Sequence, residues 1–194
     1  MNQDFVEVIA EDTISRRVTE LAADIAADHP SGDLVVVGIL KGSLLFMKDL
    51  LDNLPFDSTP QFLALTRFGT EGRVSVTLDI DEAINGRDLL LVLEIVDTGL
   101  TLATIQRMLQ AKDPRSVRTV ALLDKAPRRI VDVPIDYRGF EVGDEYLLGY
   151  GLDWNGLFRN LRSVWAVMDM PRFLENPQAF VDTAYQTERA SLDG

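Results

Sequence analysis

The sequence predicts an α/β protein built on a mainly parallel sheet that helices cover on both faces. Two observations predict this fold class. Several segments consist almost wholly of apolar residues, as strands do when both of their faces are buried. Segments with the apolar spacing of a helix alternate with them along the chain. Such alternation is typical of folds in which helices pack on a parallel sheet.

The predicted elements follow one another without a long linker or an internal repeat. The first helix carries Ile14, Val18, Leu21 and Ile25 on one stripe, and the second helix ends before Pro55. Two strand-like segments enclose the turn GTEG, which predicts a hairpin or a mobile loop. In order, we expect a helix over 12–28, a strand over 33–40, a helix over 44–54, strands over 61–68, 73–80 and 88–96, a helix over 100–112 and a strand over 116–124.

The remaining residues fit a single domain. Residues 131–140 lead towards a further strand, and residues 1–194 together suit one domain. From 171 to 194 we expect a peripheral carboxyl-terminal extension, a helix followed by a frayed end.

Composition narrows the classes of function. The chain has 31 acidic and 19 basic residues and a formal net charge of −12, which disfavours non-specific binding to nucleic acid or an anionic membrane. It has no cysteine, which excludes disulfides and thiolate chemistry, and His29 is expected to be a solvated loop residue. There is no membrane-length apolar run and the first residues are acidic, so we expect a soluble cytoplasmic protein.

Charged side chains stand where the predicted strands stop. Lys41 follows the first buried strand, Glu94 and Asp97 follow the central one, and Asp124 and Lys125 follow the next. In a parallel sheet of this kind the ligand site lies beyond the carboxyl ends of the strands. These residues are therefore the first candidates for a functional site.

The segment EIVDTGLT combines two acids with a turn suited to phosphate. Thr98, Gly99 and Thr101 lie between a strand and a helix, where backbone N–H groups and hydroxyls form a cradle for an anion. For Glu94 and Asp97 to reach one ligand, the strand has to end between them. The alternative is that Thr98 caps the helix and that both acids are solvated.

Three segments resemble the hypoxanthine-guanine branch of the type I phosphoribosyltransferases. EIVDTGLT resembles the loop that binds phosphoribosyl pyrophosphate (PRPP), and VVGILKGSLLFMKDLL resembles the pyrophosphate loop. Residues 120–161 resemble the purine-binding region almost throughout, so the resemblance spans roughly residues 10–170. It implies the type I phosphoribosyltransferase fold, a parallel sheet flanked by helices with a small hood subdomain.

The resemblance also implies roles for the PRPP loop. Thr98, Gly99, Leu100 and Thr101 would hold the 5′-phosphate of PRPP. Asp97 would lie near purine N7 and accept a proton when the glycosidic bond forms.

Further residues would bind the base, the pyrophosphate and magnesium. Lys125 would bond the 6-oxo group of the purine, Tyr146 would stack on the ring and the backbone of Leu147 would read its edge. The remaining implied residues are Lys41, Gly42 and Arg159 for pyrophosphate, and Asp153 for Mg²⁺. Positive charge at these positions suits a reaction in which pyrophosphate leaves an oxocarbenium-like ribose.

The sequence departs from the family pattern in two places. The family usually has adjacent Glu and Asp at the positions of Leu93 and Glu94, where they engage the ribose hydroxyls or the metal. Either Glu94 compensates by reaching further, or the substrate differs at the ribose, or Leu93 points into the core and the acid is dispensable. The usual Ser-Tyr pair of the closing loop is replaced by Arg67 and Phe68, an added cation and an aromatic shield against water.

The sequence therefore predicts a Mg²⁺-dependent purine salvage transferase that makes IMP or GMP from hypoxanthine or guanine and PRPP. The family resemblance suggests a homodimer or homotetramer. Two alternatives remain. One is a catalytically weak paralogue that binds nucleotide or PRPP and regulates another process, which the leucine at position 93 motivates. The other is a transferase for a different oxopurine such as xanthine.

Overall fold

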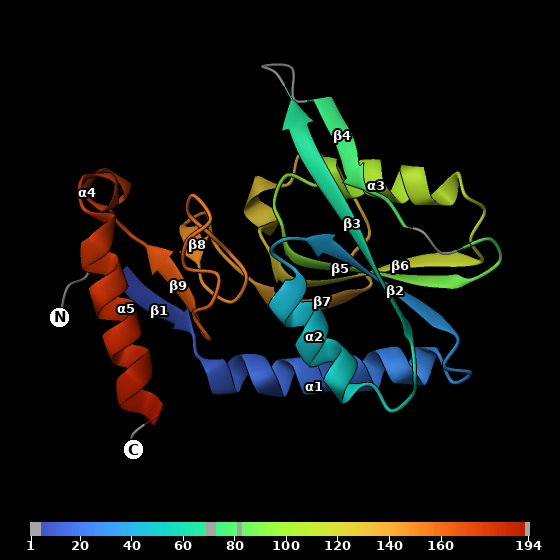
Figure 1. Cartoon of the computed structure of the whole chain (residues 1–194), viewed down its shortest axis with the longest axis horizontal. Helices are drawn as coiled ribbons and strands as arrows, with labels where there is room; N and C mark the ends of the chain where they lie inside the picture. The colour runs from blue at the N-terminus through green and yellow to red at the C-terminus, as the bar shows by residue number, and fades with distance from the viewer. Residues whose placement is uncertain (1–4, 69–72, 81–82, 193–194) are drawn as a thin grey trace. The chain divides into compact units, whose positions relative to one another are not determined.

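The computed structural model describes residues 5–68, 73–80 and 83–192, and Figure 1 shows its elements. They form two compact units, one of residues 17–143 and the other of residues 1–16 with 144–194, so that the boundary falls within the first helix. The elements are β1 (Phe5–Ile9), α1 (Glu11–Asp28), β2 (Leu34–Leu40), α2 (Leu44–Asn53), β3 (Thr59–Phe68), β4 (Arg73–Leu78), β5 (Asp88–Val96), α3 (Leu100–Gln110), β6 (Ser116–Asp124), the 3-10 helix η1 (Ala126–Arg128), β7 (Tyr137–Glu141), β8 (Tyr146–Leu148), β9 (Val164–Val167), α4 (Met170–Glu175) and α5 (Pro177–Leu192).

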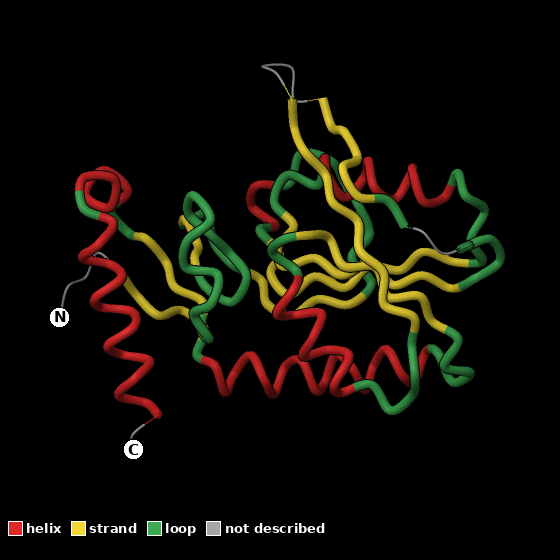
Figure 2. Tube along the Cα trace, viewed as in Figure 1, coloured by secondary structure: helices red, strands yellow, loops and turns green. Residues whose placement is uncertain are grey.

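The larger unit is built on a six-stranded sheet in the order β4-β3-β2-β5-β6-β7. All neighbouring strands are parallel except β3 and β4, which form an antiparallel hairpin at one edge. Figure 2 shows these strands in yellow, with helices on both sides of them. The predicted α/β class with a mainly parallel sheet is therefore confirmed.

The apolar segments of the sequence form the central strands of this sheet, where both strand faces are covered. Residues 34–37 and 89–92 are at most 1 % exposed, because strands β2 and β5 are covered on both faces. The stripe predicted on the first helix is also buried, and Arg17 of α1 donates hydrogen bonds to the backbone oxygens of Arg138 and Gly139 at β7. On α3 the buried residues include Leu102 and Leu109, as the helical spacing predicts.

One expectation about the larger unit is wrong. His29, expected in a solvated loop, is only 7 % exposed. The turn after α1 does contain Pro30 and Gly32, but it folds back so that the N–H of Gly32 bonds to the oxygen of His29 and Phe56 packs over Gly32. The polar residues of this segment predicted the turn correctly, whereas packing against other parts of the unit buries His29.

The smaller unit has an antiparallel sheet in the order β1-β9-β8, which the apolar patterns did not predict. Its core is aromatic: Phe5 packs edge-on against Phe180, with ring centroids 4.5 Å apart. Phe173 of α4 and Phe180 of α5 are 0 % exposed. The segment from 171, for which a peripheral extension was expected, thus supplies two of the ring side chains at the centre of this unit.

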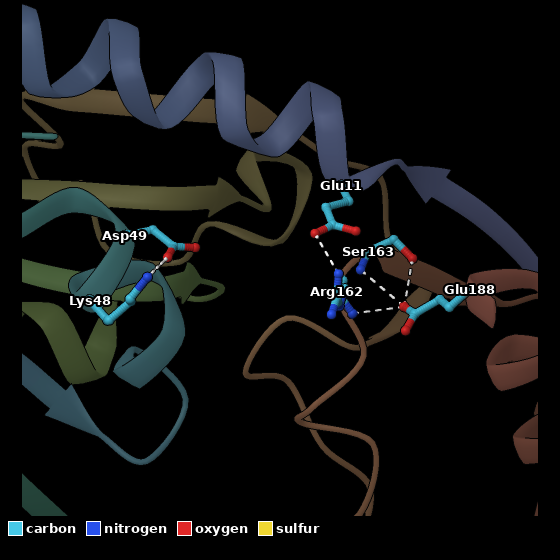
Figure 3. A network of polar contacts seen from close by, with 6 residues as sticks. All are labelled: Glu11, Lys48, Asp49, Arg162, Ser163 and Glu188. Carbon is cyan, nitrogen blue, oxygen red and sulfur yellow. Dashed lines mark hydrogen bonds and ion pairs between the residues drawn. The ribbon is translucent and has the colours of Figure 1, made fainter. Parts of the chain in front are cut away.

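A polar network fixes the carboxyl-terminal helix to the turn before β9 (Figure 3). The Oε1 of Glu188 accepts hydrogen bonds from the backbone N–H of Arg162 at 2.7 Å and from the hydroxyl of Ser163 at 3.1 Å. Ser163 is 1 % exposed and its hydroxyl also accepts from the indole N–H of Trp165. Arg162 pairs in addition with Glu11 at 3.3 Å.

Within the described residues, no helix has the length and apolar character that crossing a membrane requires.

Candidate active site

A pocket of about 280 Å³ lies in the larger unit where β5 passes into α3. Strand β5 ends at Val96, between Glu94 and Asp97, as we expected if both carboxylates are to reach one ligand. The pocket is lined by Ile39, Leu93, Glu94, Ile95, Val96, Asp97, Thr98, Gly99, Thr101 and Leu102. Both carboxylates and the two threonines of EIVDTGLT therefore line one cavity at the carboxyl end of the sheet.

The turn into α3 depends on Gly99. Its φ of +85° lies in the left-handed region that side chains disfavour, and a Cβ there would lie 2.5 Å from the backbone oxygen of Val131. The following N–H groups belong to the first turn of α3 and have no acceptor within the helix. The hydroxyl of Thr98 accepts one of them, that of Leu100, at 3.5 Å. This arrangement suits an anion at the helix amino terminus.

Asp97 is paired with a residue that the sequence reasoning did not select. Its Oδ1 accepts a hydrogen bond from the Nε of Arg128 at 2.8 Å, and both side chains are nearly half exposed. Arg128 ends the short helix η1 after β6. In the sequence, the only sign of this contact was the pair Arg128 and Arg129, four and five residues after Asp124, the acid that ends β6.

Glu94 faces the segment that follows β2. A Cβ on Gly42 would overlap the carboxylate and the Cγ of Glu94, so the glutamate side chain lies directly against this glycine. The peptide bond between Leu40 and Lys41, just before it, is cis. Leu93 beside Glu94 is 5 % exposed and belongs to the apolar core of the unit. Of the readings open for Leu93, the structure supports the one in which it points into the core.

The end of β6 carries a buried acid and a buried lysine. Asp124 is 1 % exposed and is paired with Arg129 and, at 2.8 Å, with Arg138. Lys125 is 7 % exposed, and its backbone N–H bonds to the oxygen of Val96 at 2.9 Å. This hydrogen bond holds the end of β6 beside the end of β5.

The other predicted site residues lie in the smaller unit. The carboxylate of Asp153 pairs with Arg159 at 2.6 Å and accepts the N–H of Gly156 at 2.7 Å. The hydroxyl of Tyr146 donates to the backbone oxygen of Asp153 at 3.0 Å, and burial raises the pKa of this phenol. Leu147 is buried, at 6 % exposure. Four of the predicted residues are thus neighbours along one short segment of this unit.

For the two predicted residues of the closing loop, the structure describes only the backbone. Arg67 and Phe68 end strand β3, where they pair with Val74 and Arg73 of β4, but their side chains lie outside the described part of the structure.

The donor set fits magnesium, which the family resemblance implies. In the described ranges no three potential ligands of the His, Cys, Asp or Glu type cluster into a ready cage. Magnesium is commonly held by one or two carboxylates together with substrate phosphates and waters. Asp153, partly exposed and fixed in orientation by Arg159 and Gly156, is a carboxylate of that kind.

Comparisons with known proteins agree with this geometry. Residues 7–154 match the family model of the phosphoribosyl transferase domain. The hypoxanthine-guanine phosphoribosyltransferase of Aquifex aeolicus is 40 % identical over 167 residues, 84 % of this chain and 94 % of that protein. The enzyme of the same name from Bacillus subtilis is 34 % identical, over 83 % of this chain and 92 % of that protein.

Solved structures show the same relationship. A hypoxanthine-guanine phosphoribosyltransferase from Bacillus anthracis superposes with a TM-score of 0.81 at 34 % identity, over 84 % of this chain and 98 % of that one. A hypoxanthine phosphoribosyltransferase from Trypanosoma cruzi gives a TM-score of 0.80 at 31 % identity, over 84 % of this chain and 95 % of that one. The match to the family model and the alignments with these relatives each cover most of the chain. The chain therefore belongs to the phosphoribosyltransferase family, in its hypoxanthine-guanine branch.

Proposed function

We propose that this chain transfers the phosphoribosyl group of PRPP to a 6-oxopurine, hypoxanthine or guanine, and releases pyrophosphate. The observation that carries the proposal is the pocket at the end of β5, where Glu94, Asp97 and the phosphate-type turn at Thr98 line one cavity. The bond from ribose C1′ to the pyrophosphate oxygen breaks and a bond from C1′ to purine N9 forms. The proton on purine N7 moves to Asp97.

The turn from Asp97 to Thr101 would hold the 5′-phosphate. A phosphate monoester brings about two negative charges, which the N–H groups of the first turn of α3 and the threonine hydroxyls stabilise. Glu94 would then face the ribose hydroxyls as the acceptor. Its contact with Gly42 would bring the loop after β2 close to the same substrate, where Lys41 would neutralise the pyrophosphate.

Lys125, Tyr146 and Leu147 would select the base. A lysine ammonium donates to a 6-oxo group but not to a 6-amino group, which argues for oxopurines and against adenine. Asp153 would hold Mg²⁺ and Arg159 would contact pyrophosphate. The bound metal would supply positive charge where the leaving group becomes more negative. A homo-oligomeric assembly and a cytoplasmic location stay predictions.

The test is an assay of the purified protein with Mg²⁺ and PRPP and, in separate reactions, hypoxanthine, guanine, xanthine and adenine. Monophosphate and pyrophosphate should appear in equal amounts with hypoxanthine or guanine. Asp97→Asn and Lys125→Ala should each lower the turnover at least tenfold, since each removes a group that would contact the base under this proposal. Absence of product from every base would contradict the proposal.

One observation favours a second candidate, a protein that binds nucleotide without turnover. Leu93, at the position of a family acid, is buried in the core and offers no acceptor to ribose or metal. A folded protein that binds IMP tightly and forms no product from any base would support this function. Turnover on xanthine alone would instead indicate the transferase for another oxopurine.

A further inference from the structure

We infer that Arg128 is a positioning residue that acts through Asp97, the proposed proton acceptor. The inference rests on the proposed function and adds to it a residue from outside the predicted site. Its first support is the contact itself, in which the Nε of Arg128 donates to the Oδ1 of Asp97 at 2.8 Å. Each carboxylate oxygen has two lone pairs, so this bond leaves acceptor capacity for a purine proton.

The backbone around Arg128 is fixed to the loop that carries Asp97. The N–H groups of Ile130 and Val131 both bond to the oxygen of Thr98, at 3.0 and 3.1 Å. The N–H of Arg128 bonds to the oxygen of Lys125 at 2.9 Å, which closes the turn of η1. The guanidinium is therefore presented to Asp97 by a segment that is hydrogen-bonded to the residue next to Asp97.

This ion pair has little to contribute to folding stability. The side chains of Arg128 and Asp97 are 46 % and 45 % exposed, and exposed pairs are stabilised only weakly because water screens them. A buried pair exists close by, between Asp124 and Arg129, and serves to neutralise a carboxylate that is 1 % exposed. The two arginines are adjacent in sequence, yet Arg128 contacts an acid that lines the pocket, whereas Arg129 pairs with the buried Asp124.

A proton acceptor in this pocket needs both orientation and charge balance. The carboxylate of Asp97 sits on a rotatable side chain, and holding it in one orientation lowers the cost of reaching the reactive geometry. Glu94 lines the same pocket, and the substrate brings phosphate and pyrophosphate, in a chain whose net charge is −12. The cation of Arg128 offsets part of the negative charge that Asp97 adds to this pocket.

The kinetics of Arg128→Ala and Arg128→Lys test the inference, with Arg107→Ala as the control. Arg107 is an exposed arginine of the last turn of α3 that bonds to the oxygen of Ala103. We expect Arg128→Ala to lower kcat about 10- to 100-fold, the equivalent of one charge-assisted hydrogen bond, with KM for PRPP within twofold. Arg128→Lys, or millimolar guanidinium added to the alanine variant, should restore part of the lost rate. Arg107→Ala should match the unmodified protein.

The outcomes separate this inference from the proposed function. An unmodified protein without turnover on any base overturns the proposed function, and the inference with it. An active unmodified protein whose kcat is unchanged by Arg128→Ala overturns the inference alone. So does a loss of rate that neither lysine nor guanidinium restores. Because the pair is exposed, the melting temperature of Arg128→Ala should stay close to that of the unmodified protein, which keeps the comparison one between folded enzymes.

Discussion

Gly42 and Glu94 face each other so closely that a single methyl group on the glycine would overlap the glutamate carboxylate. The two residues come from different strands, since Gly42 follows β2 and Glu94 lies near the end of β5. Strands β2 and β5 are parallel neighbours, which brings their carboxyl ends together. Gly42 is thus required by the position of Glu94.

The first prediction concerns this contact. Gly42→Ala should displace the carboxylate of Glu94, because the far end of a flexible side chain yields more easily than the backbone. We expect kcat/KM for PRPP to fall tenfold or more in steady-state kinetics, with a small change in melting temperature.

Gly86→Ala is the matched control for that variant. A Cβ at Gly86 meets no atom within 4 Å, and the residue lies in the turn before β5. Its φ is +68°, so this control should lose some stability and keep its activity. Equal kinetics for the two alanine variants would contradict a role for the contact between Gly42 and Glu94.

The second prediction concerns Leu93. Since its side chain is 5 % exposed and packs in the apolar core at the edge of the pocket, Leu93→Glu places a carboxylate among apolar neighbours. We expect a loss of about 2 to 4 kcal/mol in the free energy of unfolding, measured by urea denaturation. Leu93→Met, which nearly conserves volume, should cost less than about 1.5 kcal/mol. A glutamate variant as stable as the methionine variant would mean that a carboxylate at residue 93 turns out of the core into the pocket that this residue also lines.

The strands of the fold were predictable where a buried segment consists of a continuous run of apolar residues. Strands β2 and β5 are seven and nine residues long and consist mainly of apolar residues, and β6 contains the apolar run of residues 120–123, so these three strands could be predicted from the sequence alone. Strands β8 and β9 have three and four residues and gain their burial from tertiary contacts with aromatic side chains. No local pattern of that length distinguishes a strand from a loop.

The positions of the two acids that line the pocket were predictable for a related reason. Glu94 and Asp97 stand at a strand end, and the topology of a parallel sheet tells where strand ends meet. The pairing of Asp97 with Arg128 joins residues 31 positions apart through a short 3-10 turn. Because that turn has no periodicity, the pairing became visible only in the structure.

The third prediction concerns the carboxyl-terminal helix. Glu188→Ala removes the acceptor of three hydrogen bonds, from the N–H groups of Arg162 and Ser163 and from the Ser163 hydroxyl. A donor left without a partner in a buried position costs about 1 to 3 kcal/mol, so the melting temperature should fall. Glu175→Ala, at an exposed position at the end of α4, should leave it almost unchanged. The same melting temperature for both variants would show that the network of Figure 3 does not secure α5.

The fourth prediction concerns pH. Burial, and next the nearby Arg118, lower the pKa of His29 from its usual 6.5, while Asp88 and Asp28 oppose the shift. Its Nε2 finds no hydrogen-bond partner within the described structure. The unfolded chain therefore takes up the proton at a higher pH than the folded chain does.

This difference gives the pH dependence a definite sign. The contribution of His29 to stability is complete above pH 6.5, decreases as the pH falls towards the lowered pKa of the folded state, and is lost below it. Urea denaturation of the unmodified protein and of His29→Asn, at intervals from pH 8 to about pH 5, isolates the contribution. We expect the difference in unfolding free energy between the two proteins to shrink as the pH falls, because asparagine does not titrate. A difference that stays constant over this range would mean that the folded protein protonates His29 as readily as the unfolded chain, and hence that the imidazole reaches water.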